Sequence, residues 1–294
     1  MVTVGMQKGG VSKTTNCIHL ATALAERGKR VLLWDIDENH GATKVFGVNP
    51  EGFQTTWNVL VGDITSRDAI CEWDDEEGDV DLPENFDFIP SSRKLEKLDM
   101  RLSEQDKLYN PNDVLKPHVH ELREMNRYDY IFLDTGPTAS PTVRGALMSS
   151  EFYILSCIAE RLCMDSLPEA IADIKNARRV DRNPNLKLLG LILSQMDRRK
   201  NLAKTYEAEI QEKMKTSDNK SIKFASSIGS AADIEKAYRQ YQTLFQYKPG
   251  HVVCQQYREL AEEFEERVGY EFYERDLKKR QAETEKEERQ LANA

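Results

Sequence analysis

Short apolar runs alternate along the chain with longer segments in which apolar residues recur every three or four positions. The short runs predict strands and the longer segments predict helices. Strands are expected at 2–6, 30–35, 86–91, 128–134, 152–157, 187–194 and 222–225, and helices at 14–27, 93–103, 112–126, 141–149, 165–179, 200–214, 231–241 and 251–268. This alternation predicts βαβ units, so the expected fold class is α/β, with a mostly parallel twisted sheet flanked by helices on both faces.

The last segment, 271–294, is strongly helical in composition but has almost no apolar face after Leu277. We therefore expect one domain over residues 1–270, followed by a charged, solvent-exposed helical tail. A short coiled coil or a partner-binding arm is the alternative for this tail. It lacks the bulky apolar side chains of a membrane-surface helix, and no run of eighteen apolar residues predicts a transmembrane helix. The start of the chain does not resemble a signal peptide, so a cytoplasmic protein without a membrane partner is expected.

The formal charge of −9 argues against general binding to nucleic acid, but the charge is unevenly distributed. Residues 72–87 contain nine acidic side chains and no Lys or Arg. Residues 178–204 contain eight basic and two acidic side chains, a local charge of +6. A basic face on an acidic protein is therefore expected.

The five cysteines are Cys17, Cys71, Cys157, Cys163 and Cys254. Their number is odd, and none of them forms a C-x-x-C pair that would indicate a metal or redox site. We expect them to be small buried apolar residues.

A phosphate-binding loop is predicted between the first strand and the first helix. Residues 8–15 read KGGVSKTT, and the backbone N–H groups of such a loop point toward phosphate oxygens at the positive end of a helix. Lys13 would place a charge on the β- and γ-phosphates, and the Thr14 hydroxyl can ligate Mg²⁺. The candidate nucleotide-binding residues are Lys8, Gly9, Gly10, Val11, Ser12, Lys13, Thr14 and Thr15, and the expected cofactors are ATP and Mg²⁺.

Two further strands end in carboxylates. Residues 31–37 read VLLWDID and end in Asp35 and Asp37, whereas residues 128–137 read YDYIFLDTGP and contain Asp134. Open parallel sheets bind ligands at the carboxyl ends of their strands, so these side chains are expected near the phosphate loop. An apolar strand that ends in Asp134 is a Walker B pattern, and Asp134 is a candidate for the Mg²⁺ site.

Lys8, followed by G-G-x-x-K-T-T, resembles the deviant Walker A motif of the ParA/MinD family of P-loop ATPases, and the resemblance covers about residues 1–268. It implies that Lys8 reaches the nucleotide of a second subunit, so that ATP lies between two copies in a homodimer. It also implies that Asp37 positions the attacking water, which makes Lys8, Lys13 and Asp37 the catalytic candidates. Thr14, Asp37 and Asp134 are the metal-site candidates. Ser12 stands where the family usually has Gly and is expected to stiffen the loop.

Within this family the sequence most resembles the ParA branch. Residues 188–203 are similar to a ParA segment that contains a DNA-binding arginine, which matches Arg199 here, whereas a second family arginine near 228–236 is missing. The candidate DNA-binding residues are Arg178, Arg179, Arg198, Arg199, Lys200, Lys204, Lys236 and Arg239. The resemblance implies weak ATP turnover, non-specific DNA binding on the nucleoid, and a ParB-like or other cargo adaptor as partner. The alternative is a nucleotide-gated dimeric switch that recruits a polar or membrane-associated protein without binding DNA.

Overall fold

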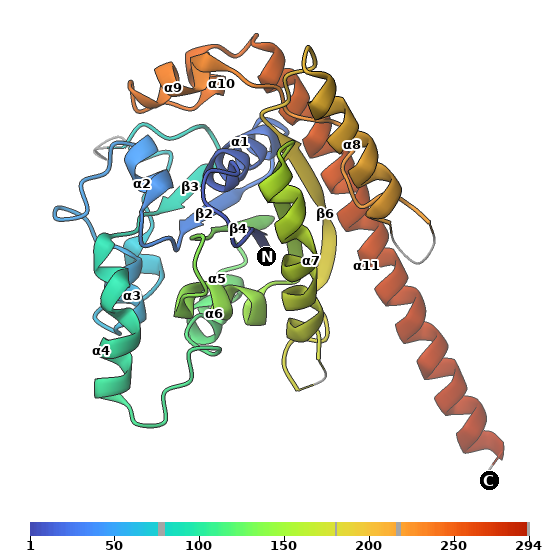
Figure 1. The fold of residues 1–294 in the computed structure, drawn as a ribbon. Coiled ribbons are helices and arrows are strands. Elements are labelled where there is room, and N and C mark those ends of the chain that lie inside the picture. Colours follow the sequence, from blue (N-terminus) through green and yellow to red (C-terminus); the bar gives the residue numbers. More distant parts are fainter. Residues whose placement is uncertain (76–79, 180, 216–218, 293–294) are drawn as a thin grey trace.

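A single parallel sheet forms the centre of the molecule. The computed structural model describes residues 1–75, 80–179, 181–215 and 219–292, with the side chains of the last helix described up to Arg275. Its strands are β1 (Val2–Gly5), β2 (Val31–Asp35), β3 (Phe86–Ile89), β4 (Tyr130–Asp134), β5 (Phe152–Ile158) and β6 (Lys187–Ser194). They are ordered β3-β2-β4-β1-β5-β6 and all pair in parallel (Figure 1), which confirms the predicted fold class.

Helices cover both faces of this sheet. They are α1 (Lys13–Glu26), α2 (Gly41–Val45), α3 (Thr56–Leu60), α4 (Leu98–Gln105), α5 (Lys116–Glu124), α6 (Pro141–Ser149), α7 (Arg161–Ala177), α8 (Asn201–Lys213), α9 (Ala232–Tyr238), α10 (Leu244–Tyr247) and α11 (Val252–Ala292), with 3-10 turns η1 (Arg67–Ala69) and η2 (Arg93–Lys97). One core layer joins α1 and α11 to the sheet. The opposite face packs against α5 and α6 in one cluster and against α7 and α8 in another. Successive strand residues alternate between these layers, as the two-residue period of a strand requires.

The predicted strand at 222–225 is wrong. These residues contribute one isolated parallel bridge, between Leu191 and Lys223, next to the edge strand β6. Backbone carbonyls of both segments instead accept hydrogen bonds from a side chain of α11. The Arg267 guanidinium donates to the carbonyls of Leu189 (2.9 Å) and Lys223 (2.9 Å). A side chain distant in sequence therefore occupies positions that further strand hydrogen bonds would otherwise fill.

Several predicted helix boundaries also differ from the structure. The segment predicted as one helix at 93–103 divides into η2 and α4, and the helix predicted at 165–179 begins four residues earlier at Arg161. The short helices α2, α3 and α10 were not predicted, because four or five residues are too few to display a helical period.

The predicted tail continues the last helix of the domain without a break. Helix α11 has 41 residues and extends away from the sheet (Figure 1), over a length of about 60 Å. The tail was expected to be exposed to solvent, but its first residues contact the domain. Phe272 packs edge-on against Phe152, with 5.7 Å between ring centroids, and Glu271 pairs with Lys187. The domain boundary at 270 stays a prediction. Among the residues that the structure describes, no helix is both long and apolar enough to cross a membrane.

Candidate functional site

The loop between β1 and α1 has the backbone shape of an anion-binding turn. Gly10 (φ 74°) and Ser12 (φ 67°) both adopt left-handed conformations. This region favours glycine and costs other residues roughly 1–2 kcal/mol. The Ser12 hydroxyl accepts a hydrogen bond from Gln195 Nε2 at 2.9 Å, which helps to hold the residue there. The first intrahelical hydrogen bond runs from Asn16 N to Ser12 O, so the N–H groups of the first turn remain available to a ligand.

Lys13 lies in this turn with only 7% of the residue exposed. Its ammonium donates to the Lys8 carbonyl at 2.9 Å, which fixes the side chain back across the loop. Burial lowers the pKa of Lys13, and the nearby carboxylates of Asp134 and Asp37 oppose this effect. The structure thus places Lys13 beside the two predicted carboxylates.

The three carboxylates come together at the carboxyl edge of the sheet. Asp35 and Asp134 are register partners on β2 and β4, and Asp37 follows two residues after Asp35. Asp35 is engaged structurally, since it accepts hydrogen bonds from Thr43 N (2.9 Å) and Thr43 Oγ1 (2.7 Å). Asp37 is 7% exposed and accepts from Asn39 N at 3.0 Å. The expectation that both strand ends lie next to the phosphate loop therefore agrees with the geometry.

Asp134 is the unusual member of this group. It is fully buried, and neither carboxylate oxygen has a well-aligned hydrogen-bond partner among the described residues. Burial, followed by the Asp35 carboxylate, raises the pKa of Asp134 well above its ordinary value, and the Thr14 hydroxyl only partly opposes this. A buried carboxylate without a partner is costly unless a cation or a donor joins it.

Two glycines explain how the motifs approach so closely. A Cβ on Gly136 would lie 2.7 Å from Asp37 Oδ1, and a Cβ on Gly41 would lie 3.1 Å from Thr14 Oγ1. The segment after β4 therefore touches Asp37, and the segment after β2 touches Thr14. Glycine at these two positions makes room for the side chains that the site requires.

The arrangement fits Mg²⁺ bound together with a nucleotide. Thr14, Asp37 and Asp134 offer hydroxyl and carboxylate oxygens, the ligands that Mg²⁺ prefers. Within the described parts of the chain, no group of three or more His, Cys, Asp or Glu side chains could hold a metal alone. Mg²⁺ usually takes one or two protein carboxylates and completes its shell with substrate phosphates and water, which suits this incomplete set.

Lys8 begins the phosphate loop. Its ammonium is buried and has no hydrogen-bond partner among the described residues. A buried cation without a partner is costly unless an anion joins it. Whether Lys8 serves the nucleotide of a second subunit stays a prediction.

Asn16 was not predicted, yet it connects the phosphate-loop helix to three distant elements. Its amide donates to Ser156 Oγ of β5 at 2.8 Å and accepts from Ser194 Oγ of β6 at 3.0 Å. It also accepts from the Tyr257 hydroxyl of α11 at 2.7 Å. Ser156 in turn donates to the Val11 carbonyl at 2.5 Å. No local pattern could reveal Asn16, because its partners lie more than a hundred residues away.

A cavity of about 230 Å³ lies beside the phosphate loop, between Ser12, Thr15, Gln195, Ser230 and Tyr238. The cavity extends between the carboxyl end of β6, at Ser194, and the start of α9, after Ala231. Its lining combines apolar and aromatic side chains, among them Ile228, Ile234 and Tyr257, with polar groups. Small-molecule sites combine the same kinds of side chain.

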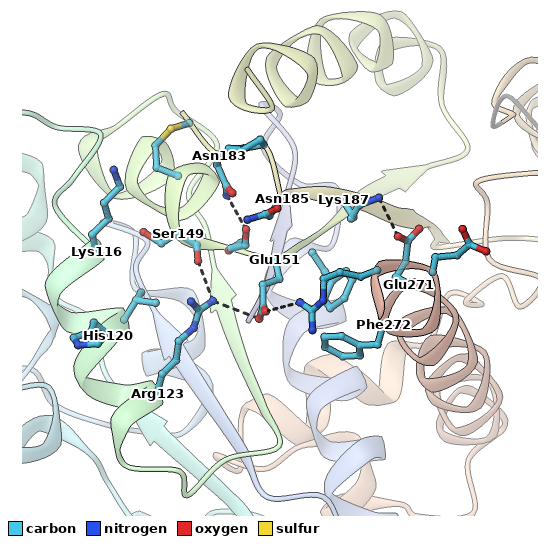
Figure 2. A pocket seen from close by; sticks show the side chains of 17 residues that line it. Lys116, His120, Arg123, Ser149, Glu151, Asn183, Asn185, Lys187, Glu271 and Phe272 are labelled. Atoms are coloured by element: carbon cyan, nitrogen blue, oxygen red, sulfur yellow. Dashed lines mark hydrogen bonds and ion pairs between the residues drawn. The ribbon is translucent and has the colours of Figure 1, made fainter. Parts of the chain in front are cut away.

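A larger cavity, of about 560 Å³, lies at the amino ends of the strands, next to the start of β5 and β6. Figure 2 shows Arg123 directed toward Glu151, at 3.3 Å, and Lys187 directed toward Glu271, at 3.2 Å. Both cations are thus already neutralised by protein carboxylates. None of the predicted nucleotide residues lines this cavity, so its size does not make it the candidate site.

The predicted basic face is not continuous. Arg178 and Arg179 follow α7 at the amino edge of the sheet, whereas Arg198, Arg199, Lys200 and Lys204 follow β6 at the carboxyl edge (Figure 1). The eight residues of β6, about 26 Å in length, separate the two groups. The expectation of one basic surface over 178–204 is therefore wrong, because charges adjacent in sequence are carried to opposite ends of a strand.

Several of the basic side chains are also paired locally. Arg199 contacts Asp197 at 2.8 Å, Lys236 contacts Asp233 at 2.7 Å, and Arg239 contacts Glu235 at 3.4 Å. Among described side chains, no carboxylate lies within ion-pair distance of Arg198, Lys200 or Lys204. The unpaired positive charge at the carboxyl edge is therefore concentrated at the start of α8.

Comparison with known proteins agrees with this geometry. Residues 1–188 match the family model AAA_31, described as an AAA domain. The chromosome-partitioning ATPase Soj of Thermus thermophilus is 29% identical over 271 residues, which cover 91% of this chain and 96% of that protein. The septum site-determining protein MinD of Pyrococcus horikoshii, solved with Mg-ADP, has a TM-score of 0.68 at 23% identity, covering 92% of this chain and 97% of its own. A plasmid partition protein of Borrelia burgdorferi has a TM-score of 0.65 at 22% identity, covering 90% and 98%. The matched residues include the phosphate loop, Asp37 and Asp134.

Proposed function

Because this chain belongs to the AAA_31 family of AAA domains, the ParA/MinD-type deviant Walker A ATPases, we propose that it is a partition-type ATPase that positions a DNA or protein cargo. The observation that carries the proposal is the convergence of Lys13, Asp37 and Asp134 at one edge of the sheet. Lys13 is a buried cation, and Asp134 is a buried carboxylate without a well-aligned hydrogen-bond partner in the described structure. ATP and Mg²⁺ together would satisfy both.

In this proposal the residues have distinct roles. The N–H groups of residues 9–15 and the Lys13 ammonium would bind the phosphates. Thr14, Asp37 and Asp134 would hold Mg²⁺, which supplies charge neutralisation for the phosphate oxygens. Asp37 would also orient the attacking water. Because Gly136 has no Cβ, it leaves room for the Asp37 carboxylate in this position. The cavity between Thr15 and Tyr238 would receive the base.

We further propose an ATP-dependent homodimer in which Lys8 of each subunit serves the nucleotide of the other. Its buried ammonium has no hydrogen-bond partner in the described structure, which supports this role. Dimerisation would join two copies of the basic start of α8 and bind DNA of any sequence with avidity. A ParB-like or other cargo adaptor would then stimulate ATP hydrolysis, and the protein would be released from DNA. In this proposal the protein is cytoplasmic and associated with the nucleoid.

The nucleotide site is tested with Asp134→Asn, which keeps the shape and removes the charge. Mg²⁺-dependent ATP hydrolysis should be lost, while the variant without ligand should be at least as stable as the wild type because a buried charge is gone. A variant that hydrolyses ATP at the wild-type rate would refute the assignment of Asp134.

The DNA surface is tested by co-sedimentation with ATP or ADP. Changing Arg198, Lys200 and Lys204 to Glu should lower affinity for any DNA by roughly two or more decades, since non-specific binding depends on phosphate neutralisation. Changing Arg178 and Arg179 to Glu is the matched control at the opposite end of β6, and it should affect binding much less.

A second candidate function is a nucleotide-gated switch that recruits a protein without binding DNA. Local carboxylates already pair with Arg199, Lys236 and Arg239, and this observation favours the switch. Wild-type protein that dimerises with ATP but does not co-sediment with DNA at low salt would select it over the DNA-binding function.

A further inference from the structure

Two cysteines that are six positions apart meet beneath the phosphate loop. Cys157 lies near the end of β5, and Cys163 lies in the first turn of α7. Their sulfur atoms are 2.6 Å apart, and both residues are fully buried. The spacing does not match the C-x-x-C pattern, so the sequence did not indicate the pair. The expectation that all five cysteines are buried holds for four of them, whereas Cys71 is only partly buried.

We propose that Cys157 and Cys163 form a reversible dithiol–disulfide pair that is oxidised by hydroperoxides. Both residues are free thiols in this structure. A disulfide requires a sulfur–sulfur distance of about 2.0 Å, so the two atoms are already close to bonding distance. Neither Cys17 nor Cys254 has a comparable contact with a second sulfur among the described residues.

The surroundings assign different roles to the two sulfurs. The hydrogen-bonded contact with Cys157 lowers the pKa of Cys163, and the Ile158 backbone and nearby Lys8 lower it further. The same interaction, together with burial, raises the pKa of Cys157. The positive end of α7 also favours a thiolate in its first turn. Cys163 is therefore the attacking thiolate and Cys157 is the resolving thiol.

The chemistry balances with a hydroperoxide as the two-electron oxidant. The Cys163 thiolate attacks the terminal peroxide oxygen, the O–O bond breaks, and Cys163 becomes a sulfenic acid. The departing hydroxide or alkoxide takes a proton from solvent and leaves as water or an alcohol. The Cys157 sulfur then attacks the Cys163 sulfur, the S–O bond breaks, and water departs with the Cys157 proton. A dithiol reductant reverses the reaction by thiol–disulfide exchange.

Access to the pair requires the first turn of α7 to open. Arg161 and Leu162 of this turn are exposed, and Leu162 is 68% exposed despite its apolar side chain. Pro168 lies inside the helix and cannot donate a hydrogen bond to the carbonyl four residues before it. The first turn is thus held to the rest of α7 by fewer hydrogen bonds than an ordinary turn, which favours local opening.

The position of the pair connects it to the nucleotide site. Cys157 and Cys163 share a core cluster with Met6 and Val11. Residue Ser156, next to Cys157, holds the Val11 carbonyl. A disulfide here would fix the first turn of α7 to the strand that supports the phosphate loop.

The test uses the full-length folded protein treated with hydrogen peroxide, alkylated under denaturing conditions and digested with trypsin. Cleavage after Arg161 separates the two cysteines, so the disulfide should appear as peptides 145–161 and 162–175 joined covalently, lighter by two hydrogens than their sum. Dithiothreitol should release them. This readout needs no variant and does not depend on nucleotide binding, so its failure is distinct from failure of the proposed function.

Two variants sharpen the test. Cys71→Ser changes a cysteine outside the pair and should leave the linked peptides unchanged, whereas Cys163→Ser should abolish them. Fully alkylated Cys157 and Cys163 after peroxide treatment would overturn the proposal. Linked peptides that form only when the protein is first unfolded in urea would overturn it as well, because folded geometry would then play no part.

Discussion

His19 should make the stability of this protein depend on pH in mildly acidic solution. Its ring is fully buried in α1, stacked against Tyr257 with 5.1 Å between centroids. Nδ1 lies 2.8 Å from the Thr15 carbonyl, and Nε2 accepts the backbone N–H of Leu244 at 3.2 Å. The ring can therefore serve both neighbours only as the neutral tautomer with the proton on Nδ1. Burial lowers the pKa of His19 from 6.5 to about 4.

The sign and size of the effect follow from proton linkage. Between these two pKa values the unfolded chain binds more protons than the folded protein, so the free energy of unfolding falls as pH falls through this window. Each pKa unit corresponds to about 1.4 kcal/mol. Lowering the pH from about 7.5 to about 4.5 should remove about 2.5 kcal/mol of stability through His19 alone.

The assay is urea unfolding followed by circular dichroism across this pH range, with wild type compared with His19→Phe. Phenylalanine keeps the stacking on Tyr257 but cannot titrate, so about 2.5 kcal/mol of the pH dependence should disappear. At neutral pH the variant should be less stable by about 1–3 kcal/mol, because the Leu244 N–H loses its acceptor. His120→Gln, at an exposed position on α5, is the matched control and should behave as the wild type. If wild type and His19→Phe lose the same free energy of unfolding when the pH is lowered, the reasoning is refuted, because His19 then contributes nothing to the pH dependence.

The remaining predictions concern the nucleotide site. Lys13→Ala should weaken ATP binding by roughly 10²-fold, because the phosphates lose a buried cation, and calorimetry showing unchanged affinity would exclude Lys13 from this role. Asp37→Ala should bind ATP and accumulate as a dimer in size-exclusion chromatography without turnover, so hydrolysis at the normal rate would contradict its assignment. Lys8→Ala should bind ATP yet remain monomeric in light scattering, and a complete ATP-dependent dimer would argue against a role in trans. Gly136→Ala should lower turnover roughly tenfold or more with ATP affinity retained, because its Cβ would displace Asp37. Its control is Gly250→Ala, where a Cβ meets nothing within 4 Å and the rate should not change.

Local patterns were sufficient to locate most residues of the candidate nucleotide site. The phosphate loop, Asp37 and Asp134 each follow a strand, and these strands were recognisable as short apolar runs. Parallel strands bring all their carboxyl ends to one edge, so their sequence positions already implied that the residues meet. The fold class and the meeting of these side chains at one end of the sheet were therefore predictable before any contact was known.

Contacts between distant segments needed the tertiary structure. The links from Asn16 to Ser194 and Tyr257 leave no trace in the neighbouring sequence, because a buried amide finds its partners through packing. The same is true of Arg267, which replaces strand hydrogen bonds at the edge of the sheet.

Proximity in the sequence was misleading in one place and uninformative in another. Residues 178–204 looked like one basic surface, but β6 carries its two groups of cations to opposite edges of the sheet. Cys157 and Cys163 looked unrelated, but the turn from β5 into α7 reverses the chain and brings their sulfurs into contact. An extended strand separates neighbours by about 3.3 Å for each residue, whereas a strand-to-helix turn folds the chain back on itself. Sequence alone therefore determined which chemistry each strand end carries, and the path of the chain in three dimensions decided which side chains share a surface.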